Sequence, residues 1–186
     1  MAIKINRKPS KYKQGKTIVT RKEHGYALTE GLVIYRSSYE LATIRILSQL
    51  YKAKRIESWT YETDVFEYVY DIDGKSHRYY MDFTLIMKSG KKIFIEVKPH
   101  SETIPPRRGK NINTYKRASE TFIKNTNKWD AVKAFVETEN RKAGKEVYGF
   151  VIWSEDILGI NKKKNIKHTS KYYQRKNSSK KAKKSK

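Results

Sequence analysis

Residues 78–98 read RYYMDFTLIMKSGKKIFIEVK, and this stretch decides the fold because it holds two strand-like segments. The segments are Arg78–Met87 and Lys92–Lys98, both rich in β-branched and aromatic residues. Between them, residues 88–90 (KSG) have the polar, glycine-containing composition of a hairpin loop. The stretch therefore predicts two adjacent antiparallel strands. Since side chains alternate along an unbroken strand, one face of the first should carry Tyr79, Met81, Phe83 and Leu85.

The length of this loop decides which residues face each other across the hairpin. A two-residue turn would place Asp82 opposite Val97 and would separate the carboxylates of Asp82 and Glu96 onto different faces. A three-residue loop with Gly90 in the left-handed conformation instead pairs Asp82 with Glu96. Directly opposite Cβ atoms are about 5 Å apart. Gly90 stands where that loop needs glycine, so we predict the three-residue register.

The remaining periodicity predicts a mixed α/β domain. A helix is expected from about Ser38 to Lys52, and a strand over residues 64–70 should precede the central pair. Helical periodicity resumes near residue 113, and a further helix is expected to start after Asn127 as N-cap and to end at Gly144. Residues 147–153 are almost wholly apolar, which is typical of a strand covered on both faces. The order helix, three strands, helices, strand predicts a sheet between helical layers.

The charge of the chain is concentrated at its two ends. The formal net charge is +23, and residues 161–186 carry twelve lysines and arginines with no acidic residue. Residues 1–26 carry eight basic residues against Glu23 alone. We therefore predict a basic N-terminal arm over 1–26, a globular domain over 27–160 and a disordered lysine-rich tail over 161–186.

Basic arms of this kind bind polyanions by releasing condensed counterions, so double-stranded DNA is the expected partner. In the tail, we predict that Lys162, Lys163 and Lys164 contact the DNA. A solubilising or ribosome-like tail is the alternative interpretation.

Composition and hydropathy also argue against a disulfide-bonded, membrane-spanning or secreted protein. The chain has no cysteine, which excludes disulfides and thiolate zinc sites. No segment approaches the roughly 18 apolar residues needed to cross a bilayer, and the first residues lack the apolar run of a secretory signal. We expect an intracellular protein without a membrane partner or a small-molecule cofactor.

Asp82 and Glu96 are candidate metal ligands. Two close carboxylates repel each other unless a cation or a shared proton lies between them. Mg²⁺ suits such a site because it prefers carboxylate oxygens and keeps several waters, and Mn²⁺ is expected to substitute for it. Lys98 could orient a water nucleophile or neutralise phosphate charge. The alternative is that both carboxylates form ordinary ion pairs with Lys98 and Arg78 on a solvated sheet face.

Two further groups could belong to the same site. Glu40 lies within the apolar arc of the first predicted helix, where an unpaired carboxylate is costly. It also fits a capping box in which its side chain reaches back to the Ser37 amide, and the two roles are compatible. The basic loop over residues 105–110, together with Arg36, is a candidate for gripping phosphates, with a merely solvated loop as the alternative. The loop residues concerned are Arg107, Arg108 and Lys110.

Several short motifs occur in an order that resembles a known family. They are YRSSYE at 35–40, RYYMD at 78–82, IEVKP at 95–99, Glu102-Thr103, Pro105-Pro106 and NTNKW at 125–129. Together they resemble the PD-(D/E)XK nuclease superfamily, and more narrowly the head completion nucleases of T-even-type phages. The resemblance covers roughly residues 30–160. One departure is Met81, where the superfamily name has proline.

The resemblance implies a restriction-endonuclease-like mixed central sheet flanked by helices and a metal-dependent DNA endonuclease. It implies a metal site at Asp82, Glu96 and Val97, with Lys98 as catalytic lysine and Glu40 as an auxiliary acid. It further implies cleavage at or near packaged DNA ends, portal or neck proteins as partners, and a place in the host cytoplasm or the virion neck. A transposon end-cleaving nuclease subunit is the nearby alternative. A structural DNA-binding protein of the phage neck without catalytic activity is the more distant one.

Deleting residues 161–186 should weaken DNA binding and flatten its salt dependence, because the affinity of a basic tail comes from counterion release. A binding titration of both chains at several salt concentrations measures the effect. Unchanged binding would indicate that the tail serves a protein partner instead.

Overall fold

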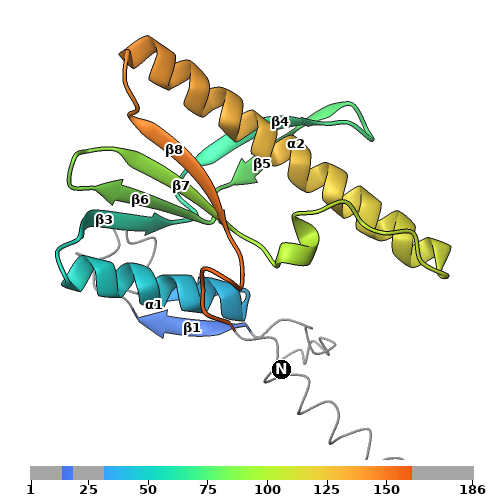
Figure 1. Cartoon of the computed structure of the whole chain (residues 1–186), viewed down its shortest axis with the longest axis horizontal. Coiled ribbons are helices and arrows are strands. Elements are labelled where there is room, and N and C mark those ends of the chain that lie inside the picture. Colours follow the sequence, from blue (N-terminus) through green and yellow to red (C-terminus); the bar gives the residue numbers. More distant parts are fainter. Residues whose placement is uncertain (1–13, 19–31, 161–186) are drawn as a thin grey trace, which may run out of the picture.

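A four-stranded sheet in the order β3–β6–β7–β8 lies between two helices (Figure 1). The computed structural model describes residues 14–18 and 32–160. Pairing is antiparallel except between β7 and β8, so the sheet is mixed, and the predicted fold class is confirmed. The elements are β1 (Gly15–Ile18), β2 (Leu32–Tyr35), α1 (Ser38–Lys52), β3 (Ile56–Tyr61), β4 (Val65–Tyr70), β5 (Lys75–Tyr80), β6 (Phe83–Met87), β7 (Lys92–Val97), η1 (His100–Glu102), α2 (Ile112–Ala143) and β8 (Tyr148–Trp153).

The β6–β7 hairpin has the predicted three-residue loop. Met87 N donates to Lys91 O at 2.9 Å, and Gly90 adopts φ +83°, which is the left-handed region. Phe83 pairs with Ile95, so the next position of the ladder sets Asp82 across from Glu96. The predicted register is therefore confirmed.

The segment predicted as one strand over residues 78–87 is broken at Met81 and Asp82. β5 pairs with β4 and β6 pairs with β3, so the chain from β3 to β6 is one long hairpin with a bend in its middle. At the bend Met81 N donates to Asp64 O at 2.9 Å, and Glu62, between β3 and β4, adopts φ +51°. The bend turns the β4–β5 hairpin toward α2 (Figure 1).

This bend changes which residues share a face, and the predicted single face is wrong. Phe83 and Leu85 pack in the core that includes Ile44 and Leu47 of α1. Tyr79 and Met81 instead join a second core, which includes Phe94 of β7 and Val132 of α2. The alternation of side chains shifts at the break, so the two halves of the predicted strand face opposite helices.

Helix α1 begins and ends where the sequence predicts. Ser37 is its N-cap, and the Ser37 hydroxyl accepts a hydrogen bond from Glu40 N at 3.1 Å. Its buried residues are Thr43, Ile44 and Leu47, which lie on the face that packs against the sheet. An amphipathic helix over one sheet face is stabilised mainly by this burial.

Helix α2 is longer than predicted. It runs without interruption over Ile112–Ala143, with Asn111 as N-cap, and ends at Gly144 in the left-handed conformation. The predicted N-cap at Asn127 is wrong, because Asn127 lies inside the helix and uses its amide elsewhere. It donates to the Asp71 carboxylate at 2.8 Å and accepts from Asp71 N at 3.1 Å, which holds the β4–β5 turn against α2.

Four other strands differ from expectation, and one of them, β2, was not predicted. β8 is an edge strand with Val151 40% exposed, so the prediction of a strand covered on both faces is wrong. β3 was not predicted, although Trp59 is fully buried in it. β1 falls within the predicted arm over 1–26 and pairs with β2, whereas the predicted tail over 161–186 lies outside the described residues. Within the described part of the chain, no helix is long and apolar enough to cross a membrane.

Replacing Gly90 with alanine should lower the free energy of unfolding by about 1 kcal/mol, because a side chain strains the left-handed conformation. Gly109→Ala is the matched control, since a Cβ atom there would likewise meet nothing within 4 Å and the backbone is not left-handed. Denaturant unfolding of both variants measures the difference. Equal stability of the two variants would contradict the role given to Gly90.

Candidate active site

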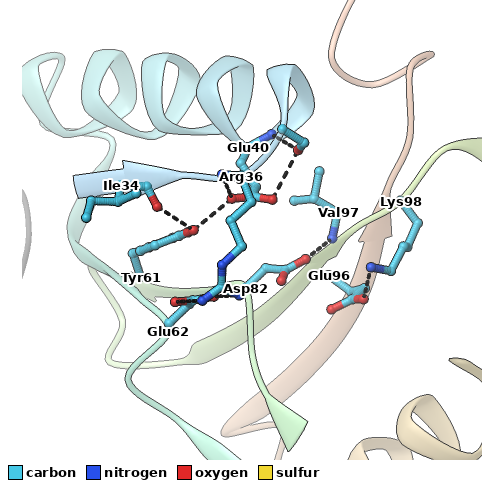
Figure 2. A network of polar contacts seen from close by, with 10 residues as sticks. Ile34, Arg36, Glu40, Tyr61, Glu62, Asp82, Glu96, Val97 and Lys98 are labelled. Atoms are coloured by element: carbon cyan, nitrogen blue, oxygen red, sulfur yellow. Dashed lines mark hydrogen bonds and ion pairs between the residues drawn. The ribbon is translucent and has the colours of Figure 1, made fainter. Parts of the chain in front are cut away.

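Asp82 and Glu96 come together where β6 begins and β7 ends (Figure 2). The Asp82 carboxylate accepts a hydrogen bond from Val97 N at 2.8 Å. The backbone of Asp82 is fixed as well, since its carbonyl accepts from Glu62 N at 3.1 Å. The bend in the long hairpin therefore places Asp82 against the backbone of β7.

The Glu96 carboxylate is almost fully buried, with a side-chain exposure of 1%. The Tyr79 hydroxyl donates a hydrogen bond to Glu96 Oε2. Figure 2 shows the second interaction, in which Lys98 Nζ lies 3.2 Å from Glu96 Oε1. A buried carboxylate is tolerated when it is both hydrogen-bonded and paired with a cation. Tyr79 and Lys98 supply these two interactions from β5 and from the end of β7.

Charges at the site perturb each other strongly. Burial, followed by the charge of Glu96, raises the pKa of Asp82 well above its ordinary value, and the nearby Lys98 only partly opposes this. Burial alone would lower the pKa of Lys98, but the charges of Glu96 and Asp82 outweigh it and raise that pKa. Lys98 is therefore a cation at neutral pH. Without a further cation, the charge of Glu96 still opposes ionisation of Asp82.

The donor atoms fit a hard divalent cation. Asp82 and Glu96 offer carboxylate oxygens. Val97, whose amide bonds Asp82, can offer only its backbone carbonyl, because its side chain is apolar. Among the described residues, no cluster of three or more histidine or acidic side chains could hold a metal. A cation here would complete its coordination with the carbonyl, water and substrate oxygens, which is the habit of Mg²⁺.

Glu40 lies on α1 above this pair and serves as part of the helix cap (Figure 2). Its Oε2 accepts from Arg36 N at 2.8 Å and from the Tyr61 hydroxyl at 2.7 Å, and its Oε1 accepts from the Ser37 hydroxyl at 3.1 Å. The predicted bond to the Ser37 amide is wrong, since Glu40 reaches the amide one residue earlier. Its charge adds to the raised pKa of Asp82, after burial and Glu96. Its role as an auxiliary acid stays a prediction.

A cleft of about 230 Å³ opens beside the carboxylate pair. Glu40 and Arg36 line one part of it, and Val97, Lys98 and Glu102 line another. Lys98 is therefore accessible from the cleft, with a side-chain exposure of 26%, although Glu96 is sealed from solvent. A phosphate that entered the cleft would meet Lys98.

Of the predicted DNA-binding residues that the structure describes, Arg36 lines this cleft. The Arg36 guanidinium forms an ion pair with Glu62 at 2.6 Å, and its side chain stays 67% exposed. Three others are exposed on the loop between η1 and α2, namely Arg107, Arg108 and Lys110. Lys162, Lys163 and Lys164 lie outside the described residues. DNA binding by all of them stays a prediction.

Two residues that hold the site were not predicted from the sequence. Tyr79 was expected only to build a sheet face, yet its hydroxyl bonds the buried Glu96. Tyr61 lies in the unpredicted strand β3 and links Glu40 to the Ile34 carbonyl at 3.1 Å. Burial raises the pKa of both hydroxyls, and the nearby carboxylates add to the shift. Both hydroxyls therefore stay protonated donors.

A mixed sheet between helices, with Asp82 just before β6, Glu96 in β7 and Lys98 just after it, defines a restriction-endonuclease-like nuclease domain. Comparisons with known proteins agree. The family described as TnsA-like endonuclease N terminal matches residues 53–142. The head completion nuclease of Enterobacteria phage T4 is 33% identical over 131 residues, which cover 68% of this chain and 81% of that relative. The chain belongs to the head completion nuclease family, as its motifs predicted. No solved structure matches it.

Replacing Asp82 with asparagine should raise the free energy of unfolding near pH 7 in metal-free buffer. Folding raises the pKa of this carboxyl, so the unfolded chain loses the proton first, and stability is lost as pH rises above the ordinary value of about 3.9. The gain should therefore shrink as the pH falls toward 4.

Denaturant unfolding over this pH range measures the gain. Asp130→Asn is the control, because Asp130 forms an exposed ion pair with Lys133. A wild-type protein more stable than Asp82→Asn at pH 7 would contradict the raised pKa.

Proposed function

We propose that this protein is a Mg²⁺-dependent endodeoxyribonuclease that hydrolyses phosphodiester bonds of double-stranded DNA during phage head completion. The observation that carries the proposal is the convergence of Asp82 and Glu96 with Lys98, which lines the cleft. The family relationship supports it, because one relative is named a head completion nuclease and the matching domain family is described as an endonuclease.

The carboxylates of Asp82 and Glu96 would hold the metal, with Mn²⁺ as a substitute, and the carbonyl of Val97 is the third protein donor. When bound, the metal supplies an activated water and stabilises charge on the phosphate. Hydrolysis then forms a bond from the water oxygen to phosphorus and breaks one phosphorus–oxygen ester bond. The products are a terminal phosphate and a terminal hydroxyl.

Lys98 and Tyr79 have separate tasks in this proposal. The raised pKa of Lys98 keeps its ammonium charged, so it can donate a hydrogen bond to a phosphate oxygen that gains negative charge. The Tyr79 hydroxyl keeps one oxygen of Glu96 fixed and leaves the other toward Lys98. The carboxylate thus enters the reaction already oriented, which lowers the reorganisation that the reaction requires.

The exposed basic residues would supply affinity rather than chemistry. Arg107, Arg108 and Lys110 lie on one exposed loop and would contact the DNA backbone, as would Arg36 at the cleft. Such contacts position a duplex without reading its sequence. Action at or near packaged DNA ends, beside portal or neck proteins in the host cytoplasm or the virion, completes the proposal.

Purified protein should cut linear and supercoiled DNA when Mg²⁺ or Mn²⁺ is added and should not cut when the metal is chelated. Asp82→Asn, Glu96→Gln and Lys98→Gln should each reduce cleavage by about 100-fold or more, because each removes a group acting on the reacting phosphate. Gel analysis of the products over time measures the rates.

Lys133→Gln is the control for loss of one positive charge, since Lys133 lies on the exposed side of α2 in an ion pair with Asp130. It should cut as the wild type does. Absence of metal-dependent cutting, or equal cutting by the Asp82 and Lys98 variants, would favour the structural DNA-binding alternative.

A further inference from the structure

A second lysine faces the carboxylate pair from the helix on the other side of the sheet. Lys128 lies in the middle of α2, and its side chain is only partly exposed. Its ammonium lies 4.9 Å from the centre of the Tyr79 ring and 5.9 Å from that of Tyr68. Since the Tyr79 hydroxyl bonds Glu96, one aromatic ring separates Lys128 from the buried carboxylate.

Within residues 14–18 and 32–160, Lys128 has no carboxylate partner in hydrogen-bonding range. The described residues include ion pairs for Lys98 with Glu96 and for Lys91 with Glu146, but none for Lys128. Ring faces stabilise an ammonium by only about 0.5–2 kcal/mol, so a partly buried cation without an anion is costly. The cost appears in the titration of the group, because burial lowers the pKa of Lys128 below its ordinary value.

The field at Lys128 is that of the candidate active site. Glu96 and Asp82 act to raise its pKa, whereas Lys98 and the neighbouring Lys124 act to lower it, so all three site groups lie within electrostatic range. When both carboxylates are ionised and no metal is bound, Asp82, Glu96 and Lys98 sum to one net negative charge, which would repel a DNA phosphate. Lys128 cancels that charge without occupying a carboxylate oxygen.

We propose that Lys128 is a substrate-binding residue that contacts a non-bridging oxygen of the DNA phosphate at, or next to, the bond that is cut. This inference rests on the proposed nuclease function and adds a phosphate contact from α2. An ammonium over a ring face keeps N–H donors that do not point at the ring, and an anionic oxygen can accept from them in place of the lost water. Lys98 and Lys128 would then hold the phosphate from β7 and from α2.

Lys128→Gln tests the contact, because glutamine keeps part of the stem and removes the charge. Two measurements are made on the full chain. The first is binding to a short linear DNA duplex in metal-free buffer at several salt concentrations. Loss of one phosphate contact should reduce the magnitude of the slope of log K against log salt by about one. The second is steady-state cleavage with Mg²⁺, in which kcat/KM should fall about tenfold or more.

Two variants separate a phosphate contact from a structural effect of the ring contact. Lys128→Arg keeps a charge that also stacks on rings and should restore most of the binding slope. Lys133→Gln removes one charge from the same helix and should leave the slope unchanged. All variants should unfold with the wild-type midpoint to within a few degrees.

The outcomes are distinct. A wild-type salt slope for Lys128→Gln would overturn the inference, even if the wild type cuts DNA. A reduced slope for Lys128→Gln that is restored by arginine would support it. Failure of the wild type to cut with any metal would overturn the proposed function instead, and the metal-free slope would still decide the role of Lys128.

Discussion

The close approach of Asp82 to Glu96 is the constraint on which the rest of the site depends. It requires the register of the β6–β7 hairpin, which Gly90 permits through its left-handed backbone. It also requires an anchor for Asp82, which the amide of Val97 supplies. The conflict between the two carboxylates is offset in part by Lys98, and a divalent cation would complete the balance. The fold thus holds two carboxylates close together, and the proposed cation would offset their repulsion.

The bend in the long hairpin explains how one sheet serves two helices. Before the bend, Tyr79 and Met81 pack toward α2, and after it Phe83 packs toward α1. The bend therefore brings both the Tyr79 hydroxyl and the Asp82 carboxylate to the end of β7. Without it, the Tyr79 hydroxyl would point away from Glu96, and the buried carboxylate would lose a donor. Packing and site geometry are consequences of the same break.

Local signals predicted the parts of the structure that depend on local chemistry. The cap at Ser37, the loop at Gly90 and the helix end at Gly144 follow from residues that suit those backbone positions. The break at Met81 could not be predicted, because it depends on pairing with Asp64, seventeen residues earlier in the chain. Asn127 misled for a similar reason, since an amide suited to an N-cap is equally suited to bonding Asp71. Tyr79 reaches Glu96, and Lys128 reaches the Tyr79 ring, through contacts between elements, which spacing alone does not reveal.

The anchoring of Asp82 by a backbone amide has a consequence for how this protein can evolve. Proline at position 97 would remove that donor, whereas any other residue would keep it. The Val97 side chain is also buried in the core against α1, so the position must remain apolar and of similar size. One residue thus belongs to the hydrophobic core through its side chain and to the acidic centre through its backbone. A substitution of Val97 that disturbs the core would therefore also disturb the position of Asp82.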